Sequence, residues 1–280
     1  MAPPALARGN VAVITGGASG IGLAAAQRFL ASGMKVTIAD LPGERLDAAK
    51  HELAGSRGEF LALATDVSDR DEVRRLETAV LDRFGPVNVL MNNAGIQPGS
   101  SLFDDPAAWE RVLAVNLWGP IHGVQVFAPG MIAHGQPGMI INTGSKQGIT
   151  TPPGDPAYNV AKAGVKVLTE ALAHELRSVP ACRITAHLLI PGFVFTPLTA
   201  RGRTEKPAGA WTPEQTIDFM LDSLDRGDFY ILCPDNDVPR CLDEQRILWA
   251  AQDIIANRPA LSRWHPDWSE RFKAWLEESA

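Results

Sequence analysis

Short apolar runs alternate with amphipathic segments along the first two thirds of the chain. Six of these runs end in small or polar residues: VAVITGG, KVTIAD, EFLALATDV, VNVLMNNAG, GMIINTGS and RITAHLLIPG. The first three are followed by apolar residues at helical spacing, in IGLAAAQRFLASG, GERLDAAKHELAG and RDEVRRLETAVLDRFG. Strands without polar alternation are typical of a parallel sheet with helices on both faces. The pattern therefore predicts an α/β fold with a doubly wound, parallel, seven-stranded sheet, whose last strand lies in FYILCPDNDVPRC.

The chain shows no linker, repeat or low-complexity segment, so we predict a single domain over residues 1–280. The irregular stretch TPLTARGRTEKPAGAWTP is too long for an ordinary connection, and loops of that length are usually lids or disordered. We predict a lid-like segment at about 196–225, which brings down Trp211 as its apolar residue, and a C-terminal helical extension at about 234–280.

The predicted extension is rich in aromatic residues. Trp249 is followed by four that lie close to the spacing of one helical face: Trp264, Trp268, Phe272 and Trp275. Three interpretations of this aromatic stripe are open. It packs on the chain's own core, which we favour, or it contacts another subunit, or it forms a wall of the substrate pocket.

Composition narrows the possible functions. A formal net charge of −6 argues against a surface for nucleic acid or anionic membrane, because no basic stripe is available to neutralise phosphates. The N-terminal residues have no apolar signal core, and no apolar run is long enough to span a bilayer. The three cysteines form no CxxC pair, and the six histidines show no ligand-like spacing. We expect a reducing, cytoplasmic setting and no protein metal site.

Glycines and an acidic residue follow the first two predicted strands. The glycines of TGGASGIG allow a tight turn, and the helix N-terminus behind them attracts a pyrophosphate. The spacing is not the GxGxxG of the usual dinucleotide fingerprint, so the loop alone is a modest signal. Asp40 ends the second strand, where a carboxylate accepts hydrogen bonds from an adenosine ribose and repels a 2′-phosphate. Leu41 follows it, and the glycine loop contains no cation, so the sequence favours NAD over NADP.

Tyr158 and Lys162 lie one turn apart if AYNVAKAG is helical. In one interpretation the phenol packs on the aliphatic lysine stem, as is common. In the other, the ammonium loosens the phenolic proton for acid–base chemistry.

Several motifs, in order and spacing, resemble the classical short-chain dehydrogenases/reductases: TGGASGIG, NNAG, Asn116, Ser145, YNVAK and PGFVFT. The resemblance covers roughly residues 8–197. YxxxK alone is a weak motif, but the full set in order is highly specific. The resemblance implies a Rossmann fold, an NAD-dependent oxidoreductase that interconverts a secondary alcohol and a ketone, and a homodimer or homotetramer.

The same resemblance implies four catalytic residues. Tyr158 would be the general acid or base, and Lys162 would favour its phenolate and bond the nicotinamide ribose. Ser145 would hydrogen-bond the substrate oxygen. Asn116 would hold a water that links the lysine to solvent, although a simple polar residue at a helix kink is the alternative.

The family pattern also implies the groups that contact the cofactor. They are Gly16, Ser19 and Ile21 at the diphosphate, Asp40 at the adenosine ribose, Asp66 and Val67 at the adenine, Asn93, Ala94 and Gly95 near the ribose, Pro191, Val194 and Thr196 at the nicotinamide amide, and Tyr158 and Lys162. Candidate substrate residues beside Ser145 and Tyr158 are Gln97, Phe193 and Trp211, with Trp118, Ile149, Phe195 and Met220 as further candidates. These side chains are mostly bulky and apolar, which favours a hydrophobic or aromatic substrate, although each could equally belong to the core.

Three features depart from the family pattern. The segment TTPPGDPAY is proline-rich and should hold the loop over the active site stiffly. Lys146 follows Ser145, where a small or apolar residue is usual; we interpret it as a solvated loop charge, with contact to an anionic substrate as the alternative. The extension replaces the usual Asp-Gly-Gly turn, which puts the usual tetramer in doubt. Two rival functions remain: a dehydrogenase of a 3-hydroxyacyl or sugar-acid substrate, and a catalytically silent NAD-binding protein.

Overall fold

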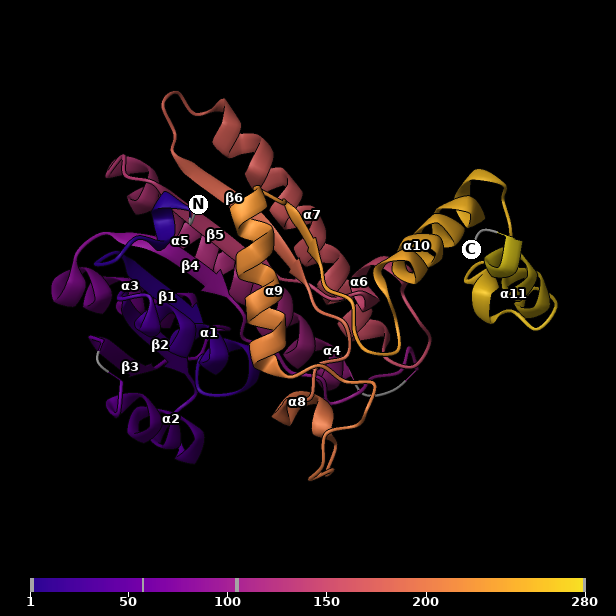
Figure 1. The fold of residues 1–280 in the computed structure, drawn as a ribbon, viewed down its shortest axis with the longest axis horizontal. Coiled ribbons are helices and arrows are strands. Elements are labelled where there is room, and N and C mark those ends of the chain that lie inside the picture. The colour runs from indigo at the N-terminus through magenta and orange to yellow at the C-terminus, as the bar shows by residue number, and fades with distance from the viewer. Residues whose placement is uncertain (1–2, 57, 104–105, 279–280) are drawn as a thin grey trace.

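Seven parallel strands form one sheet in the computed structural model, which describes residues 3–56, 58–103 and 106–278. The strands are β1 (Val11–Thr15), β2 (Lys35–Asp40), β3 (Phe60–Ala64), β4 (Val87–Asn92), β5 (Gly138–Thr143), β6 (Ile184–Ile190) and β7 (Tyr230–Leu232). Their order in the sheet is β3-β2-β1-β4-β5-β6-β7 (Figure 1). The predicted doubly wound, seven-stranded sheet is therefore confirmed.

Helices cover both faces of the sheet. One face packs against α1 (Gly20–Ala31), α2 (Glu44–Ala54) and α9 (Pro213–Arg226), and the other against α3 (Arg70–Phe84), α5 (Gly119–Ala133) and α7 (Pro156–Ser178). Successive strand residues point to opposite faces, so Ile14 joins the first core layer and Val13 the second. Both layers exclude water, which explains why most strand positions are apolar.

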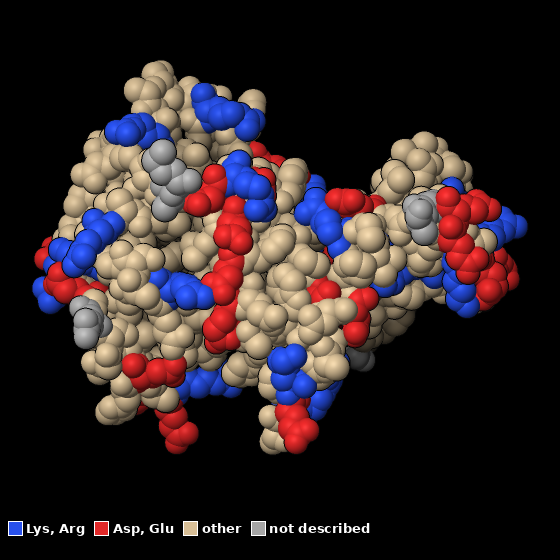
Figure 2. Space-filling model, viewed as in Figure 1, with Lys and Arg blue, Asp and Glu red and all other residues tan. Residues whose placement is uncertain are grey.

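The remaining elements complete the described chain. They are η1 (Pro4–Leu6), α4 (Pro106–Leu113), the π-helical turn η2 (Ala114–Trp118), α6 (Gln147–Thr150), α8 (Pro197–Ala200), α10 (Arg240–Ile255), η3 (Ser262–Trp264) and α11 (Ser269–Glu278). No helix in the described ranges is both long and apolar enough to cross a membrane. On the face shown in Figure 2, basic side chains are scattered rather than gathered in one stripe.

The segment predicted as lid-like contains a regular helix in its second half. Helix α9 begins at Pro213 with a capping box in which Thr212 and Gln215 exchange hydrogen bonds. Ile217 and Met220 of this helix are fully buried against the sheet. The lid interpretation is therefore wrong for residues 213–225, and Met220 belongs to the core rather than to a substrate pocket.

The C-terminal extension projects from the body of the molecule (Figure 1). Helix α10 packs on α6, and α11 packs on η3. The predicted aromatic stripe is not one helical face, because the chain is extended at His265 before Pro266, and a proline disfavours helix at the preceding residue.

Trp249 instead forms the centre of an aromatic cluster within the extension. The ring centroids of Trp268, Phe272 and Trp275 lie 6.4, 5.2 and 5.3 Å from its own. Its indole Nε1 donates a 2.7 Å hydrogen bond to Ser262 Oγ. The aromatic residues thus give the extension a small core of its own, separate from the core beside the sheet.

This cluster predicts a local loss of stability on substitution. Trp249 is 3% exposed, so Trp249→Ala should cost about 3–5 kcal/mol within the extension, because it removes a large buried ring and leaves a cavity. Trp264, 36% exposed, is the matched control, and Trp264→Ala should cost less than about 1 kcal/mol. Urea unfolding followed by circular dichroism measures both. Equal losses in the two variants would contradict this account of the cluster.

Candidate active site

A cleft of about 240 Å³ lies at the carboxyl ends of the strands. The strand order reverses between β1 and β4, so the loops after these two strands diverge and leave a crevice. All fourteen residues predicted to contact a cofactor line this cleft: Gly16, Ser19, Ile21, Asp40, Asp66, Val67, Asn93, Ala94, Gly95, Tyr158, Lys162, Pro191, Val194 and Thr196. Ser145 lines it as well.

The loop after β1 requires glycine for two separate reasons. Gly16 has a φ of +63°, and an added Cβ would lie 2.6 Å from Ala94 Cα. A Cβ on Gly22 would lie 2.2 Å from the Gly16 carbonyl oxygen. Helix α1 begins directly behind this loop, and its N-cap Ser19 makes no side-chain capping bond. Free N–H groups at a helix N-terminus fit the diphosphate of a dinucleotide, so the chain's own residues match the predicted cofactor.

Asp40 holds the glycine loop as well as facing the cleft. Its Oδ2 accepts a 2.9 Å hydrogen bond from the Ala18 N–H, and its Oδ1 accepts one of 2.9 Å from the Leu41 N–H. Each oxygen retains acceptor capacity for a ribose hydroxyl. Arg45, in the first turn of α2, also lines the cleft, and the sequence analysis missed it. The signal was available, because Arg45 lies in the helix that starts directly after β2.

The two edges of the crevice are joined by hydrogen bonds from the NNAG motif. The Thr15 hydroxyl accepts bonds of 3.0 and 3.2 Å from the N–H groups of Asn93 and Ala94. The Asn93 side chain donates to the carbonyls of Thr15 and Gly16 at 3.2 and 3.1 Å. The motif therefore fixes the position of the glycine loop, a role that the sequence analysis did not assign to Thr15.

Tyr158, Ser145 and Lys162 meet at one end of the cleft. Tyr158 and Lys162 lie one turn apart on α7, with Lys162 Nζ 5.6 Å from the centroid of the phenol ring. Burial raises the pKa of Tyr158 to about 12, while its hydrogen bond with the Ser145 side chain acts in the opposite direction. Burial lowers the pKa of Lys162 to about 8. Lys162 Nζ donates a 2.8 Å bond to the Thr143 carbonyl, which holds the ammonium at the end of β5.

Asn116 does not line the cleft but lies directly behind it. It occupies the π-helical turn η2 and is fully buried. Its Oδ1 accepts a 2.8 Å bond from the Ile96 N–H, and its Nδ2 donates a 2.7 Å bond to the Ile96 carbonyl. A Cβ on Gly95 would lie 3.4 Å from Asn116 Oδ1 and 3.8 Å from Lys162 Nζ, so Asn116 and Lys162 approach the same point of the chain.

Most of the predicted substrate residues lie elsewhere. Gln97 lines a second groove next to the cleft, together with Ile96, Pro98, Arg111 and Leu198. Phe193 and Trp211 line neither the cleft nor this groove. Their backbones pair with each other, and the Trp211 ring packs on Phe219 with the ring centroids 5.7 Å apart.

The further pocket candidates also lie outside the cleft and groove. Trp118 is 52% exposed and lies beside His122, and Ile149 packs against the core. Phe195 lines neither hollow.

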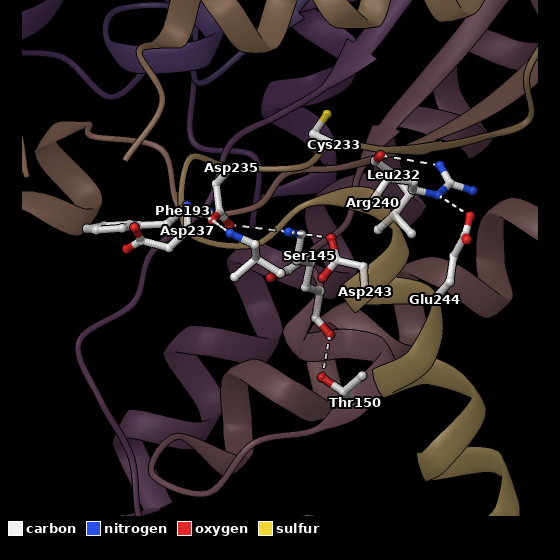
Figure 3. A network of polar contacts seen from close by, with 12 residues as sticks. Ser145, Thr150, Phe193, Leu232, Cys233, Asp235, Asp237, Arg240, Asp243 and Glu244 are labelled. Carbon is white, nitrogen blue, oxygen red and sulfur yellow. Dashed lines mark hydrogen bonds and ion pairs between the residues drawn. The ribbon is translucent and has the colours of Figure 1, made fainter. Parts of the chain in front are cut away.

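Lys146 is neither solvated nor aimed at a substrate. Its side chain is 18% exposed, and its Nζ lies 3.2 Å from Asp235 Oδ2 and 2.6 Å from Asp243 Oδ2 (Figure 3). Two carboxylates from the C-terminal part of the chain thus neutralise it. The interpretation of Lys146 as a solvated charge is wrong. The alternative, contact with an anionic substrate, is not supported either, because the Lys146 ammonium is already paired with Asp235 and Asp243.

Comparisons with known proteins agree with this geometry. Residues 10–207 match the family described as short chain dehydrogenase. The 3-oxoacyl-(acyl-carrier-protein) reductase FabG of Thermotoga maritima is 36% identical over 222 residues, which cover 79% of this chain and 85% of the relative.

Two solved structures are similar in both fold and sequence. A short chain dehydrogenase/reductase from Burkholderia phymatum in complex with NAD has a TM-score of 0.81 and 31% identity, covering 90% of this chain and 96% of that one. A metagenomic short-chain oxidoreductase in complex with NADP has a TM-score of 0.67 and 30% identity, covering 81% of this chain and 98% of that one.

The buried ammonium predicts a pH dependence of stability. The pKa of Lys162 is about 8 in the fold and about 10.4 in an unfolded chain. Between these values the unfolded chain binds the proton that the folded chain has lost, so the free energy of unfolding rises with pH. The contribution of Lys162 should increase by about 1.5 kcal/mol between pH 8 and pH 9.5.

Lys162→Met should abolish this increase, as measured by urea unfolding of the protein without cofactor at several pH values. Lys166→Met is the control, because Lys166 lies one turn later on α7 and pairs with Glu170 at the surface. If wild type and Lys162→Met change in parallel with pH, the buried ammonium is not the source.

Proposed function

The chain belongs to the short-chain dehydrogenase family, and we propose that it is an NAD(H)-dependent oxidoreductase that interconverts a secondary alcohol and a ketone. The observation that carries the proposal is the meeting of three groups at one end of the cleft: the Tyr158 phenol, the Ser145 hydroxyl and the Lys162 ammonium. A nicotinamide dinucleotide, when bound, supplies or accepts the hydride.

Proton transfer is the task of Tyr158. In alcohol oxidation its phenolate takes the hydroxyl proton as the hydride leaves the carbon; in ketone reduction its phenol returns that proton to the oxygen. Ser145 donates a hydrogen bond to the same oxygen and fixes its position. Burial, with a smaller contribution from the charge of Asp155, raises the pKa of Tyr158 to about 12, so nearby positive charge is needed to stabilise the phenolate. The ammonium of Lys162, one turn away, provides it in its protonated state.

Asp40 supports the choice of NAD. Its carboxylate lines the cleft after β2, and the adenosine 2′-phosphate of NADP would bring a like charge to this position. Arg45 lines the same region, and its positive charge would offset part of this repulsion.

For the substrate, we propose a hydrophobic or aromatic secondary alcohol. Ile96 lines both hollows, and Leu198 lines them from α8. A second candidate is a 3-hydroxyacyl substrate with an anionic carrier, because Arg45 and Arg111 line the groove beside Gln97 and the FabG relative is a reductase of that class. Turnover of aromatic alcohols and of 3-hydroxyacyl thioesters, each assayed with NAD, separates the two.

We further propose that residues 196–212 act as a flap over the cleft and that the protein is a homodimer or homotetramer. Thr196 and Leu198 line the cleft, while residues 201–206 are exposed. The far end of the flap is held in place, because the Asn236 side chain donates hydrogen bonds to the carbonyls of Ala208 and Ala210.

Oligomerisation is supported by large apolar side chains on α7 that are exposed in the single chain, Val160 at 49% and Val167 at 62%.

The role of Tyr158 predicts a specific loss of activity. Tyr158→Phe should lower kcat about 10³-fold and leave the Kd for NAD nearly unchanged, because it removes only the proton-transfer group. The assay follows absorbance of reduced nicotinamide across a panel of alcohols, and a fluorescence titration measures binding. Tyr230→Phe is the control, since Tyr230 is the second of the chain's two tyrosines and lies 48% exposed on β7. A Tyr158→Phe enzyme that keeps most of its activity would refute the assignment, and a wild type that binds NAD without turnover would indicate a silent binding protein.

The role of Asp40 predicts a change in cofactor preference. Asp40→Asn should weaken NAD binding about tenfold, the loss expected for a hydrogen bond to a charged group, and should bring the Kd of NADP closer to that of NAD. Titration of both cofactors into wild type and variant measures this. Asp47→Asn on α2, which removes an exposed carboxylate paired with Lys50, should change neither value. Tighter binding of NADP than of NAD by the wild type would contradict the proposal.

A further inference from the structure

A buried ion cluster ties the C-terminal part of the chain to the end of the cleft. Lys146 Nζ lies between Asp235 Oδ2 at 3.2 Å and Asp243 Oδ2 at 2.6 Å, and we name these three residues the Lys146 triad (Figure 3). Both carboxylate side chains are 5% exposed. Because a buried charge is costly without a partner, these three groups hold one another in place.

The triad touches two segments of the proposed active site. Lys146 directly follows Ser145 in the chain. Asp235 Oδ2, the oxygen that faces Lys146, also accepts a 3.0 Å hydrogen bond from the N–H of Phe193. This N–H follows Pro191 and Gly192, which line the cleft.

The turn at Gly192 fits closely against the ion pair. A Cβ at this position would lie 2.5 Å from Asp235 Oδ2 and 2.8 Å from Lys146 Nζ. The backbone of the turn and the ion pair are therefore in direct contact, and a shift of one moves the other.

The third member of the triad, Asp243, comes from the extension, as Asp235 does. Asp243 lies in the first turn of α10, the helix that packs on α6. Helix α6 begins directly after Lys146, which is its N-cap residue. The Lys146 carbonyl oxygen accepts a 3.1 Å hydrogen bond from the N–H of Thr150 in this helix. The extension thus reaches the Ser145 segment through both a helix contact and an ion pair.

We propose that Lys146, Asp235 and Asp243 are positioning residues for the reaction, which fix Ser145 and the 191–193 turn relative to each other and make the extension a working part of the active site. The inference rests on the proposed function for the role of Ser145. A lysine between two carboxylates suits this task, because its ammonium has three donors and can hold two segments at once.

The first test needs no activity. Asp243→Asn removes one charge of the triad and leaves the Lys146–Asp235 pair neutral, so the variant should fold. Hydrogen–deuterium exchange of the protein without cofactor should become about tenfold faster in peptides covering 145–151 and 190–196, as expected when a charge-assisted contact is lost. Glu244→Gln is the matched control: it makes the same carboxylate-to-amide change at the next residue, in an exposed pair with Arg240, and should leave both peptides unchanged.

The second test uses catalysis in a double-mutant cycle. Asp243→Asn should lower kcat about tenfold or more through misplacement of Ser145, whereas Glu244→Gln should not. In a Ser145→Ala background, Asp243→Asn should have little further effect on kcat, because the hydroxyl that it positions is already absent.

Three results would overturn the proposal. The first is hydrogen–deuterium exchange in Asp243→Asn that matches exchange in Glu244→Gln. The second is exchange that rises over the whole sheet, and the third is a loss in kcat that is additive with that of Ser145→Ala. The second and third results would mean that the triad only stabilises the fold. Gly192→Ala provides an independent perturbation, since its methyl group pushes on the same ion pair without changing charge, and it should accelerate exchange in the 145–151 peptide. A wild type without dehydrogenase activity would refute the proposed function while leaving the exchange test valid.

Discussion

The reversal of strand order between β1 and β4 is the constraint on which the rest of the molecule depends. Loops after these two strands diverge, and a crevice forms between them at the strand ends. The crevice keeps its width because the Thr15 hydroxyl accepts hydrogen bonds from the backbone of Asn93 and Ala94. With its edges fixed, the glycine loop can bring the N-terminus of α1 to the floor of the cleft.

Strand β5 brings the reactive groups to that crevice. Its last residue, Thr143, accepts a hydrogen bond from the buried Lys162 ammonium, and Ser145 follows two residues later. Helix α7 supplies Tyr158 and Lys162 from the same face, one turn apart. The register between β5 and α7 therefore decides whether the serine, the phenol and the ammonium meet. The Asn116 amide supports this arrangement from behind by holding the backbone of Ile96.

The extension is built differently from the body of the molecule. It has its own aromatic cluster around Trp249 and projects beyond the sheet (Figure 1). Its connection to the body passes through α10, whose first turn carries Asp243 toward Lys146 (Figure 3). An element that stabilises itself and joins the body beside the proposed active site can influence that site without lining it.

The sequence by itself determined the strands, the parallel sheet and the fourteen cleft residues predicted to contact a cofactor. It could do so because apolar runs and short motifs act over a few positions and strand ends converge by geometry. Only the tertiary structure decided the surroundings of Lys146, which pairs with Asp235 at a distance of 89 residues in the chain. The same holds for Phe193 and Trp211, which were expected at the substrate: their backbones pair with each other, and neither residue lines the cleft. The sequence around a bulky or charged side chain does not show which distant segment will cover it. Its role therefore depends on packing between elements, which local sequence patterns do not specify.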